Sequence, residues 1–213
     1  MADAVSICNL ALSYLGDAAN MVSIDEPEKS AQAELCSRLY PMTVSALLDM
    51  HDWSFATKRQ AVPELTEEEG FGWRRVYQTP SDAIRIISVK DYNRQRLGSS
   101  EFRYVGDSFP DYDLPHADFE VKDKKLYTDV DNAVVEYISS NTDVSRFTPD
   151  FVDALAYLLA HKVVGARVKG KEGQTLAQML LKQFYVSLST AKTKDASQQK
   201  KRIHFVPSWI QAR

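Results

Sequence analysis

The feature that most constrains the fold of this 213-residue chain is a change of hydrophobic period within residues 47–56. Before this junction, apolar residues recur at three- and four-residue spacing, which is typical of a helix. After it, residues 55–61 alternate in the manner of a strand. The strand pattern continues to about residue 140, where the helical period returns. We therefore predict one helical body with a β domain inserted into it.

Two helices are expected before the junction. Residues 3–15 carry apolar side chains on one face, and Gly16 is a suitable residue to end the helix. Residues 28–51 show the same period over a longer stretch. Pro41 lies inside this second helix and removes one backbone hydrogen bond, so we expect a kink there.

The middle of the chain contains about six short stretches with strand character, separated by frequent turns. Residues 84–89, Ile-Arg-Ile-Ile-Ser-Val, have the strongest strand character because they are rich in β-branched side chains. Residues 119–121 and 126–128 flank the sequence Lys-Asp-Lys-Lys and predict a hairpin. Short strands with this spacing favour a small antiparallel sandwich or an open barrel.

The helical period returns at a well-marked helix start. Thr148 can cap the helix, Pro149 suits its first position, and Asp150 places an acid in its first turn. We expect this helix to end at Gly170 and a fourth helix to cover residues 172–194. The expected fold class is α+β, with a helical bundle (1–52 and 146–195), an inserted β domain (53–145) and an extended C-terminal tail (196–213).

Charge is distributed unevenly along the chain. The formal net charge is −3, which argues against a globally basic nucleic-acid-binding protein. Residues 192–213, however, contain six basic residues and one acidic residue. The rest of the chain is therefore more acidic than the total indicates, and the basic character is confined to the C-terminal end.

Cysteine usage and the apolar segments indicate the cellular compartment in which the protein folds. Cys8 and Cys36 both fall in predicted helices, and we expect two reduced thiols in a protein that folds in a reducing cytoplasm. The N-terminus lacks the features of a secretory signal. The most apolar stretch, residues 155–164, is interrupted by His161 and Lys162 and is too short to span a bilayer.

The sequence offers little for catalysis, and we predict no catalytic residue, no cofactor site and no metal site. It contains no Gly-rich phosphate loop and no nucleophile elbow. His51 and Asp52 form the only adjacent acid–base pair, but the pair is more typical of a helix end followed by a turn. His161 lies beside an apolar helix face and is more typical of a core or interface histidine than of a metal ligand.

One alternative function is a metal-dependent hydrolase. Asp111, Asp113, Asp118 and Glu120 are close in sequence, and carboxylates are the ligands that hard divalent cations prefer. Their spacing does not match an EF-hand loop, so a solvated loop is the preferred interpretation.

A second alternative is a DNA-binding module. Arg74 and Arg75 lie beside Trp73, and cations next to aromatic rings are able to hold phosphates and stack on bases. The basic tail would add further phosphate contacts. An ordinary sheet face with cross-strand ion pairs is the preferred interpretation for the two arginines.

The C-terminal tail is the most suggestive segment for binding. Residues 200–210, Lys-Lys-Arg-Ile-His-Phe-Val-Pro-Ser-Trp-Ile, combine cations with large apolar side chains, whose exposure to water costs free energy. The tail either folds back on its own domain or docks on a partner, and docking is the preferred interpretation. Addition of a strand to the partner's sheet is one way in which it would dock. The residues expected to bind the partner are Lys201, Arg202, Ile203, Phe205 and Trp209.

Several short motifs occur in a characteristic order in the first part of the chain. They are residues 7–12 (Ile-Cys-Asn-Leu-Ala-Leu), 15–16 (Leu-Gly), 22–26 (Val-Ser-Ile-Asp-Glu), Ala31, Cys36, Tyr40, 47–48 (Leu-Leu) and 53–56 (Trp-Ser-Phe-Ala). In order and spacing, this set resembles the tail tubular protein A family of short-tailed bacteriophages. The resemblance covers mainly residues 5–62, extends more weakly over residues 77–89, and is one of layout in the rest of the chain.

The resemblance implies a virion structural protein and not an enzyme. Members of the family are head-to-tail adaptors, which form rings, usually of twelve copies, between the portal protein and the tail nozzle protein. Such a ring lines the channel through which DNA passes without specific binding, and it has no membrane partner. The implied location is the phage neck, with the host cytoplasm as the site of assembly. An acidic body fits this role because like charge repels DNA phosphates.

Three apolar residues lie at or near the junction between the predicted helical body and the predicted β domain. We assign Leu48, Trp53 and Phe55 to the hinge between the helical and β domains, as structural residues. The tail would then be the segment that grips the portal or a neighbouring subunit, because a tail that orders on docking is able to wrap a partner's surface.

Overall fold

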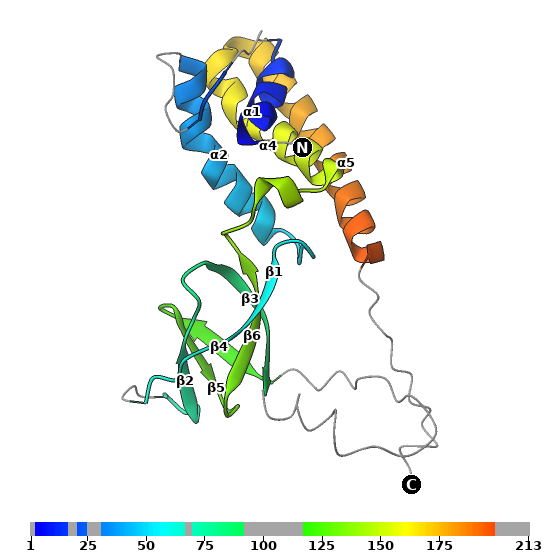
Figure 1. Ribbon diagram of the computed structural model, residues 1–213. Coiled ribbons are helices and arrows are strands. Elements are labelled where there is room, and N and C mark those ends of the chain that lie inside the picture. The colour runs from blue at the N-terminus through cyan, green and yellow to red at the C-terminus, as the bar shows by residue number, and fades with distance from the viewer. Residues whose placement is uncertain (1–2, 17–20, 25–30, 67–69, 92–116, 199–213) are drawn as a thin grey trace, which may run out of the picture. The chain divides into compact units, whose positions relative to one another are not determined.

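The computed structural model describes residues 3–16, 21–24, 31–66, 70–91 and 117–198. Within these residues the fold is α+β, with four α-helices and two small three-stranded antiparallel sheets that remain open (Figure 1). The predicted fold class is therefore confirmed. The chain divides into a helical unit, Met1–Ala56 with Ser140–Gln198, and a β unit that includes Thr57–Ser139. The predicted extended tail lies outside the described residues.

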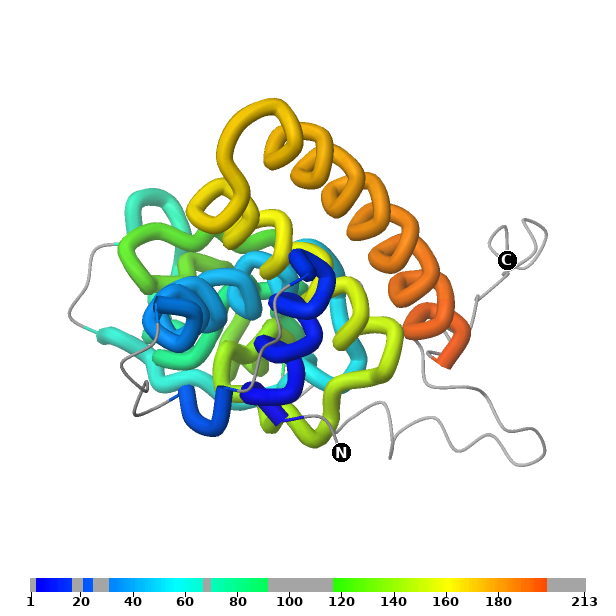
Figure 2. Tube along the Cα trace, turned by 90° about the horizontal axis from the view of Figure 1, so that it is seen from above, coloured from blue at the N-terminus to red at the C-terminus, as the bar shows by residue number. Residues whose placement is uncertain are grey.

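The helical unit is organised around a central helix. This helix, α4 (Pro149–Arg167), contacts α1 (Ala4–Ser13), α2 (Ala31–Asp49) and α5 (Gly170–Gln198) (Figures 1 and 2). The α4–α5 contact is the most extensive of the three. Because every helix turns an apolar face toward α4, the core of the unit lies along it. Fully buried core residues include Ile7, Leu12, Leu47, Leu48, Phe151, Leu155, Leu159 and Phe184.

Polar side chains fix the start and the flank of α1. Asp3 accepts a hydrogen bond from the backbone N–H of Ser6 at 2.7 Å, and the Ser6 hydroxyl oxygen accepts one from the Asp3 N–H at 2.9 Å, which forms a capping box. Asn9 binds both backbone groups of Met21, donating to its carbonyl at 3.0 Å and accepting from its N–H at 3.1 Å. The asparagine within the first motif therefore holds the segment that follows α1 against that helix.

The start of α4 agrees with the sequence prediction, whereas the end of α5 does not. Thr148 caps α4 by accepting a hydrogen bond from the Phe151 N–H at 3.4 Å, and proline occupies the first turn. Gly170 has φ +78°, a conformation that favours glycine and permits the tight connection into α5. The fourth helix was expected to end at residue 194, but α5 continues to Gln198. Its last turn includes Asp195, whose buried carboxylate accepts hydrogen bonds from Ser54 and stabilises the extension.

The two cysteines are free and fully buried, as expected from the sequence. Cys8 lies in α1 and Cys36 lies in α2, so the two thiols meet where these helices approach each other. A hydrogen bond to Cys36, together with burial, raises the pKa of Cys8 well above its ordinary value. A thiol held in its neutral form in this way behaves as a small apolar core residue.

The junction after α2 differs from the sequence prediction in one respect. Residues 55–62 were expected to form a strand, but the strand begins at Thr57. The Phe55 ring instead joins an aromatic cluster in the helical unit, with ring centroids 5.0 Å from Phe151 and 5.5 Å from Phe147. Trp53 is fully buried in the same cluster and donates its indole N–H to the Leu47 carbonyl at 3.0 Å. Aromatic packing therefore holds Phe55 in the helical unit and delays the start of the strand.

The β unit contains two antiparallel sheets, each with its strands ordered around a central one. In the first sheet β6 (Ala133–Ser139) lies between β1 (Thr57–Ala61) and β3 (Ala83–Asp91). In the second sheet β5 (Lys125–Thr128) lies between β2 (Arg75–Gln78) and β4 (Phe119–Lys122).

The predicted hairpin is confirmed as the β4–β5 connection. Asp123 and Lys124 form its two-residue turn, with φ +48° and φ +60°. Positive φ at both central positions matches the turn that suits the twist of a two-residue hairpin. Among the roughly six stretches with strand character, the short alternating one at residues 101–105 lies outside the described residues.

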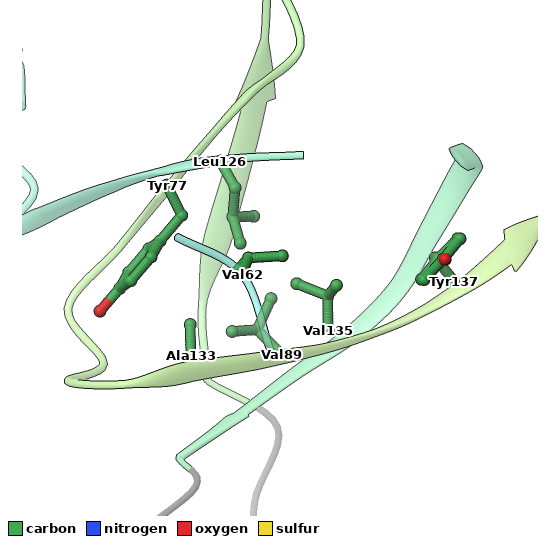
Figure 3. Packing of buried hydrophobic residues seen from close by; sticks show 7 residues of the cluster. All are labelled: Val62, Tyr77, Val89, Leu126, Ala133, Val135 and Tyr137. Atoms are coloured by element: carbon green, nitrogen blue, oxygen red, sulfur yellow. The ribbon is translucent and has the colours of Figure 1, made fainter. Parts of the chain in front are cut away.

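The core of the β unit is built from both sheets. Its buried residues are Val62, Tyr77, Val89, Leu126, Ala133, Val135 and Tyr137 (Figure 3). In Figure 3 the side chains of Val89, Val135 and Leu126, from three strands, point toward one another and toward Val62, the residue after β1. Because β2 and β5 contribute Tyr77 and Leu126 to the same cluster as β3 and β6, the two sheets pack face to face.

Candidate functional site

The most deeply buried charged side chain in the described part of the chain belongs to Asp195, near the end of α5. Its carboxylate accepts hydrogen bonds from the backbone N–H of Ser54 at 3.2 Å and from the Ser54 hydroxyl at 2.5 Å. The His51 Nε2 atom lies 3.4 Å from Oδ2 of the same carboxylate, which is an electrostatic contact rather than a well-formed hydrogen bond. Three polar side chains from two distant segments therefore converge on one buried point.

Local structure after α2 presents His51 and Ser54 to this carboxylate. The Trp53 N–H donates to the His51 carbonyl and the Ala56 N–H donates to the Trp53 carbonyl, which folds residues 51–56 into consecutive turns. The His51 ring packs edge-on against the buried Trp53 ring, with centroids 4.9 Å apart. The tryptophan thus orients the imidazole on one side while Asp195 faces it on the other.

The cluster contains serine, histidine and aspartate, but it is not arranged for nucleophilic catalysis. A catalytic serine donates its hydroxyl proton to a histidine, which is in turn oriented by a carboxylate. Here the Ser54 hydroxyl donates to Asp195 itself. The geometry joins the last turn of α5 to the segment after α2, and its role is to fix the position of that helix end.

For His51 and Asp52 the sequence favoured a helix end followed by a turn over an acid–base pair, and α2 does end at Asp49. The acid that the structure brings to His51 is the distant Asp195. The spacing of apolar residues in α5 already indicated that Asp195 would be buried and would need a polar partner. Leu188, Ala191 and Asp195 fall at spacings of three and four on the buried face of α5, so the carboxylate interrupts an apolar stripe. An acid on an apolar helix face requires a buried partner.

His161 has a structural role that matches its sequence interpretation. Its Nδ1 atom lies 3.0 Å from the Ala177 carbonyl oxygen, which links α4 to α5 within the helical unit. An interface histidine of this kind supports helix packing.

The acidic residues considered for a metal site are dispersed or lie outside the described residues. Asp111 and Asp113 fall in the latter group. The Glu120 carboxylate pairs with the Lys122 ammonium at 2.8 Å and lies 3.4 Å from the Trp73 indole nitrogen. Within the described segments, no group of three or more histidine, cysteine, aspartate or glutamate side chains has the geometry to hold a metal ion.

The two arginines considered for DNA binding form ion pairs with acids of the β unit. Arg75 contacts Glu64 at 2.6 Å and Asp131 at 2.9 Å, and Arg74 lies 3.7 Å from Asp131. The hydrogen bonds that Arg75 donates to the Glu64 and Asp131 carboxylates raise the pKa of Arg75 above its ordinary value. The carboxylates of Glu64 and Asp131 thus neutralise Arg74 and Arg75. This agrees with the preferred sequence interpretation, in which the two arginines form ion pairs on a sheet face.

The five residues expected to bind a partner, Lys201, Arg202, Ile203, Phe205 and Trp209, all lie outside the described residues. The structure therefore neither places them nor brings them together. The described chain ends at Gln198, the last residue of α5.

The described residues do contain one exposed surface with the composition of a binding face, on α5. Tyr185 is 60% exposed and Val186 is 58% exposed, at the centre of a shallow groove along this helix. The residues that line the groove are Gln178, Leu181, Lys182, Tyr185, Val186, Ser189 and Thr190, and we refer to them as the α5 stripe. Sequence reasoning missed this surface because it assigned α5 only a buried face.

Comparisons with known proteins add no relative to this picture: no protein-family model matches the chain, and a search of curated proteins finds no match. In the described part of the chain, no helix combines the length and apolar character needed to cross a membrane.

Proposed function

We propose that this chain is a structural protein of a short-tailed bacteriophage virion. In this role it is a head-to-tail adaptor, several copies of which form a ring between the portal protein and the tail nozzle protein. The proposed function is mechanical: the ring connects head to tail and lines the channel for DNA. The resemblance of residues 5–62 to the tail tubular protein A family is the origin of the proposal.

The observation that carries the proposal is the interrupted helical unit. The resemblance implies a helical bundle whose sequence is interrupted by a β domain. The chain has such a helical unit, built from the segments that precede and follow Thr57–Ser139 in the sequence. This arrangement is uncommon enough to support the resemblance, because most consecutive elements of a domain are neighbours in space.

The motifs that carry the resemblance also have defined structural roles. Ile7, Cys8, Cys36 and Trp53 are fully buried in the helical unit. Asn9, the polar residue of the first motif, binds both backbone groups of Met21. The motifs therefore specify one packed unit together, and their order along the chain supports a shared fold with the adaptors.

The charge distribution supports the same role. The chain is acidic overall, and its excess of basic residues is confined to residues 192–213. An acidic ring repels the phosphates of passing DNA, whereas a basic, apolar tail is suited to a protein partner. The proposed partner-binding residues are Lys201, Arg202, Ile203, Phe205 and Trp209, with the aromatic and aliphatic side chains as anchors.

The experiment that tests the proposal mixes the purified chain with the portal protein of the same phage and examines the particles by negative-stain electron microscopy. An adaptor adds a second ring, of matching symmetry, to the portal ring. A chain ending at Gln198 keeps the whole of α5, so it should fold and yet fail to attach. Portal rings that remain unchanged in the presence of the folded full-length chain would refute the adaptor role.

Single substitutions in the tail sharpen the same test. Trp209→Ala removes the largest proposed anchor and should weaken attachment by at least about tenfold, as expected for a central aromatic side chain. Gln211→Ala, two positions later, is the matched control and should leave attachment unchanged. Attachment that is equally strong in the Trp209→Ala variant would assign the contact to another part of the chain.

A further inference from the structure

The α5 stripe is an exposed surface with an unusual composition for a long helix. It runs along α5 from Gln178 to Thr190, a distance of about 18 Å at the rise of an α-helix. Lys182 is the one charged residue among its seven members. Exposed helical faces are normally rich in charged residues, whereas protein interfaces are depleted of them and enriched in tyrosine.

The stripe lies on the opposite side of α5 from the helix core. Leu180, Phe184, Leu188 and Ala191 are the buried residues of α5 and pack in the helical unit, whose extensive α5 contact is with α4. The positions of the stripe fall between them in sequence, at three- and four-residue spacing, and form a second ridge. In Figures 1 and 2, α5 runs alongside α4. Tyr185 and Val186, the most exposed apolar members of the stripe, therefore lie outside the core of their own unit, whereas Leu181 is half-buried.

The stripe is complementary to itself when two copies of α5 run antiparallel. If the two-fold axis passes between Tyr185 and Val186, each of these side chains meets the other in the second copy. On either side, Lys182 then meets Ser189, and Leu181 meets Thr190. Tyr185 and Val186 lie at the centre, and the pairs on either side are polar (Lys182 with Ser189) or mixed (Leu181 with Thr190).

Charge also favours this arrangement. The one cation of the stripe, Lys182, faces a hydroxyl in the second copy. The two lysines of the pair are offset by seven residues, or roughly 10 Å along the axis, which limits their repulsion in water. Because no like charges face each other directly across this contact, two copies are able to bind without an electrostatic penalty.

We infer that the partner of the α5 stripe is a second copy of this chain, bound through an antiparallel α5–α5 contact with Tyr185 and Val186 at its centre. A helix pair of this length covers less than the roughly 800 Å² per partner of a standard stable interface. The pair is therefore weak and forms at micromolar or higher concentrations. A two-fold contact closes at two copies, so this self-association is independent of the proposed adaptor ring.

The first experiment measures the molar mass of the full-length chain by sedimentation equilibrium from about 1 to about 500 µM, a range that detects weak pairs. The average mass should rise toward that of a dimer. Val186→Glu places two carboxylates at the centre of the pair and should weaken association at least about tenfold. Gln183→Glu introduces the same charge at an exposed position of α5 outside the stripe and should leave the association unchanged.

The second experiment tests the geometry by disulfide cross-linking. Val186→Cys places two thiols close to the two-fold axis, so mild oxidation with diamide should give covalent dimers. Gln183→Cys is the matched control and should give no covalent dimer, while Cys8 and Cys36 are fully buried. Circular dichroism of each variant verifies folding, which the exposed positions should preserve.

Three outcomes would overturn the inference. The first is a chain that stays monomeric up to the highest concentration and gives no Val186→Cys dimer. The second is self-association that Val186→Glu leaves unchanged. The third is stronger self-association in a chain ending at Gln198, which would identify residues 199–213 as the occupant of the stripe. None of these results depends on the portal protein, so they are separate from the test of the adaptor role.

Discussion

The carboxylate of Asp195 accepts hydrogen bonds from both the backbone N–H and the hydroxyl of Ser54, a residue 141 positions earlier in the chain. This contact joins the last turn of α5 to the turn that follows α2. It therefore ties together the two sequence segments that make up the helical unit.

Asp195→Ala is predicted to destabilise the helical unit by about 2 kcal/mol, because it removes the charged acceptor of the part-buried hydrogen bonds from the Ser54 N–H and hydroxyl. The free energy of urea unfolding, followed by circular dichroism, measures the change. Ser197→Ala, at an exposed position of the same helical turn, is the control and should shift stability by less than about 0.5 kcal/mol. Equal effects of the two substitutions would show that the Ser54 contact contributes nothing to stability.

Asn9→Ala is predicted to destabilise the helical unit by about 1–3 kcal/mol. The Asn9 amide pairs with both backbone groups of Met21, and a methyl group leaves them unpaired in a largely buried position. Unfolding in urea gives the magnitude. Ser13→Ala changes an exposed residue of the same helix and is the matched control. The prediction fails if the loss for Asn9→Ala is no greater than that for Ser13→Ala.

Periodicity alone predicted most of the architecture, because the helices and hairpins follow local patterns. The change of period within residues 47–56 predicted the insertion, and the Thr148–Pro149 signal predicted the start of α4. The Lys-Asp-Lys-Lys segment predicted the β4–β5 turn, where Asp123 and Lys124 take positive φ. In each case the signal lies within a few residues of the structure that it specifies.

The features that the sequence did not reveal depend on contacts between distant residues. Phe55 alternates with its neighbours like a strand residue, yet its ring packs on Phe147 and Phe151 in the helical unit. Asp195 lies one residue beyond the predicted end of its helix, yet its carboxylate accepts hydrogen bonds from Ser54, and no local pattern predicts that partner. The α5 stripe was missed for a related reason, since a residue such as Tyr185 shows its exposure only once the core-facing side of α5 is known.

The pH dependence of the β unit is predicted to involve Asp82. Burial alone would raise the pKa of Asp82, but hydrogen bonds from Ser139, Lys58 and Tyr137 outweigh it and hold the pKa below its ordinary value. A lowered pKa stabilises the folded protein above the ordinary pKa of an aspartate, about 4, and this contribution is lost as the pH falls through the folded pKa.

The measurement for Asp82 is the free energy of unfolding at a series of pH values between 7 and 2 for the original chain and for Asp82→Asn. The original chain should be more stable at neutral pH, and the difference should shrink below about pH 4 as Asp82 becomes protonated. Ser139→Ala removes one donor to the carboxylate and should reduce this pH-dependent difference in part. A difference that stays constant over the whole range would contradict the proposed role of Asp82.

Lys124→Gly is predicted to stabilise the β unit, although it removes a side chain. Lys124 has φ +60° at the second position of the β4–β5 turn, where a residue with a Cβ atom is strained by roughly 1–2 kcal/mol. Glycine relieves that strain but makes the unfolded chain more flexible, which costs about 0.5–1 kcal/mol. The net stabilisation is therefore about 0.5 kcal/mol. Urea unfolding should show a higher midpoint for Lys124→Gly and a lower one for Lys125→Gly, since Lys125 lies in β5 and glycine weakens a strand. If both substitutions lower the midpoint, the turn carries no strain at Lys124 that glycine is able to relieve.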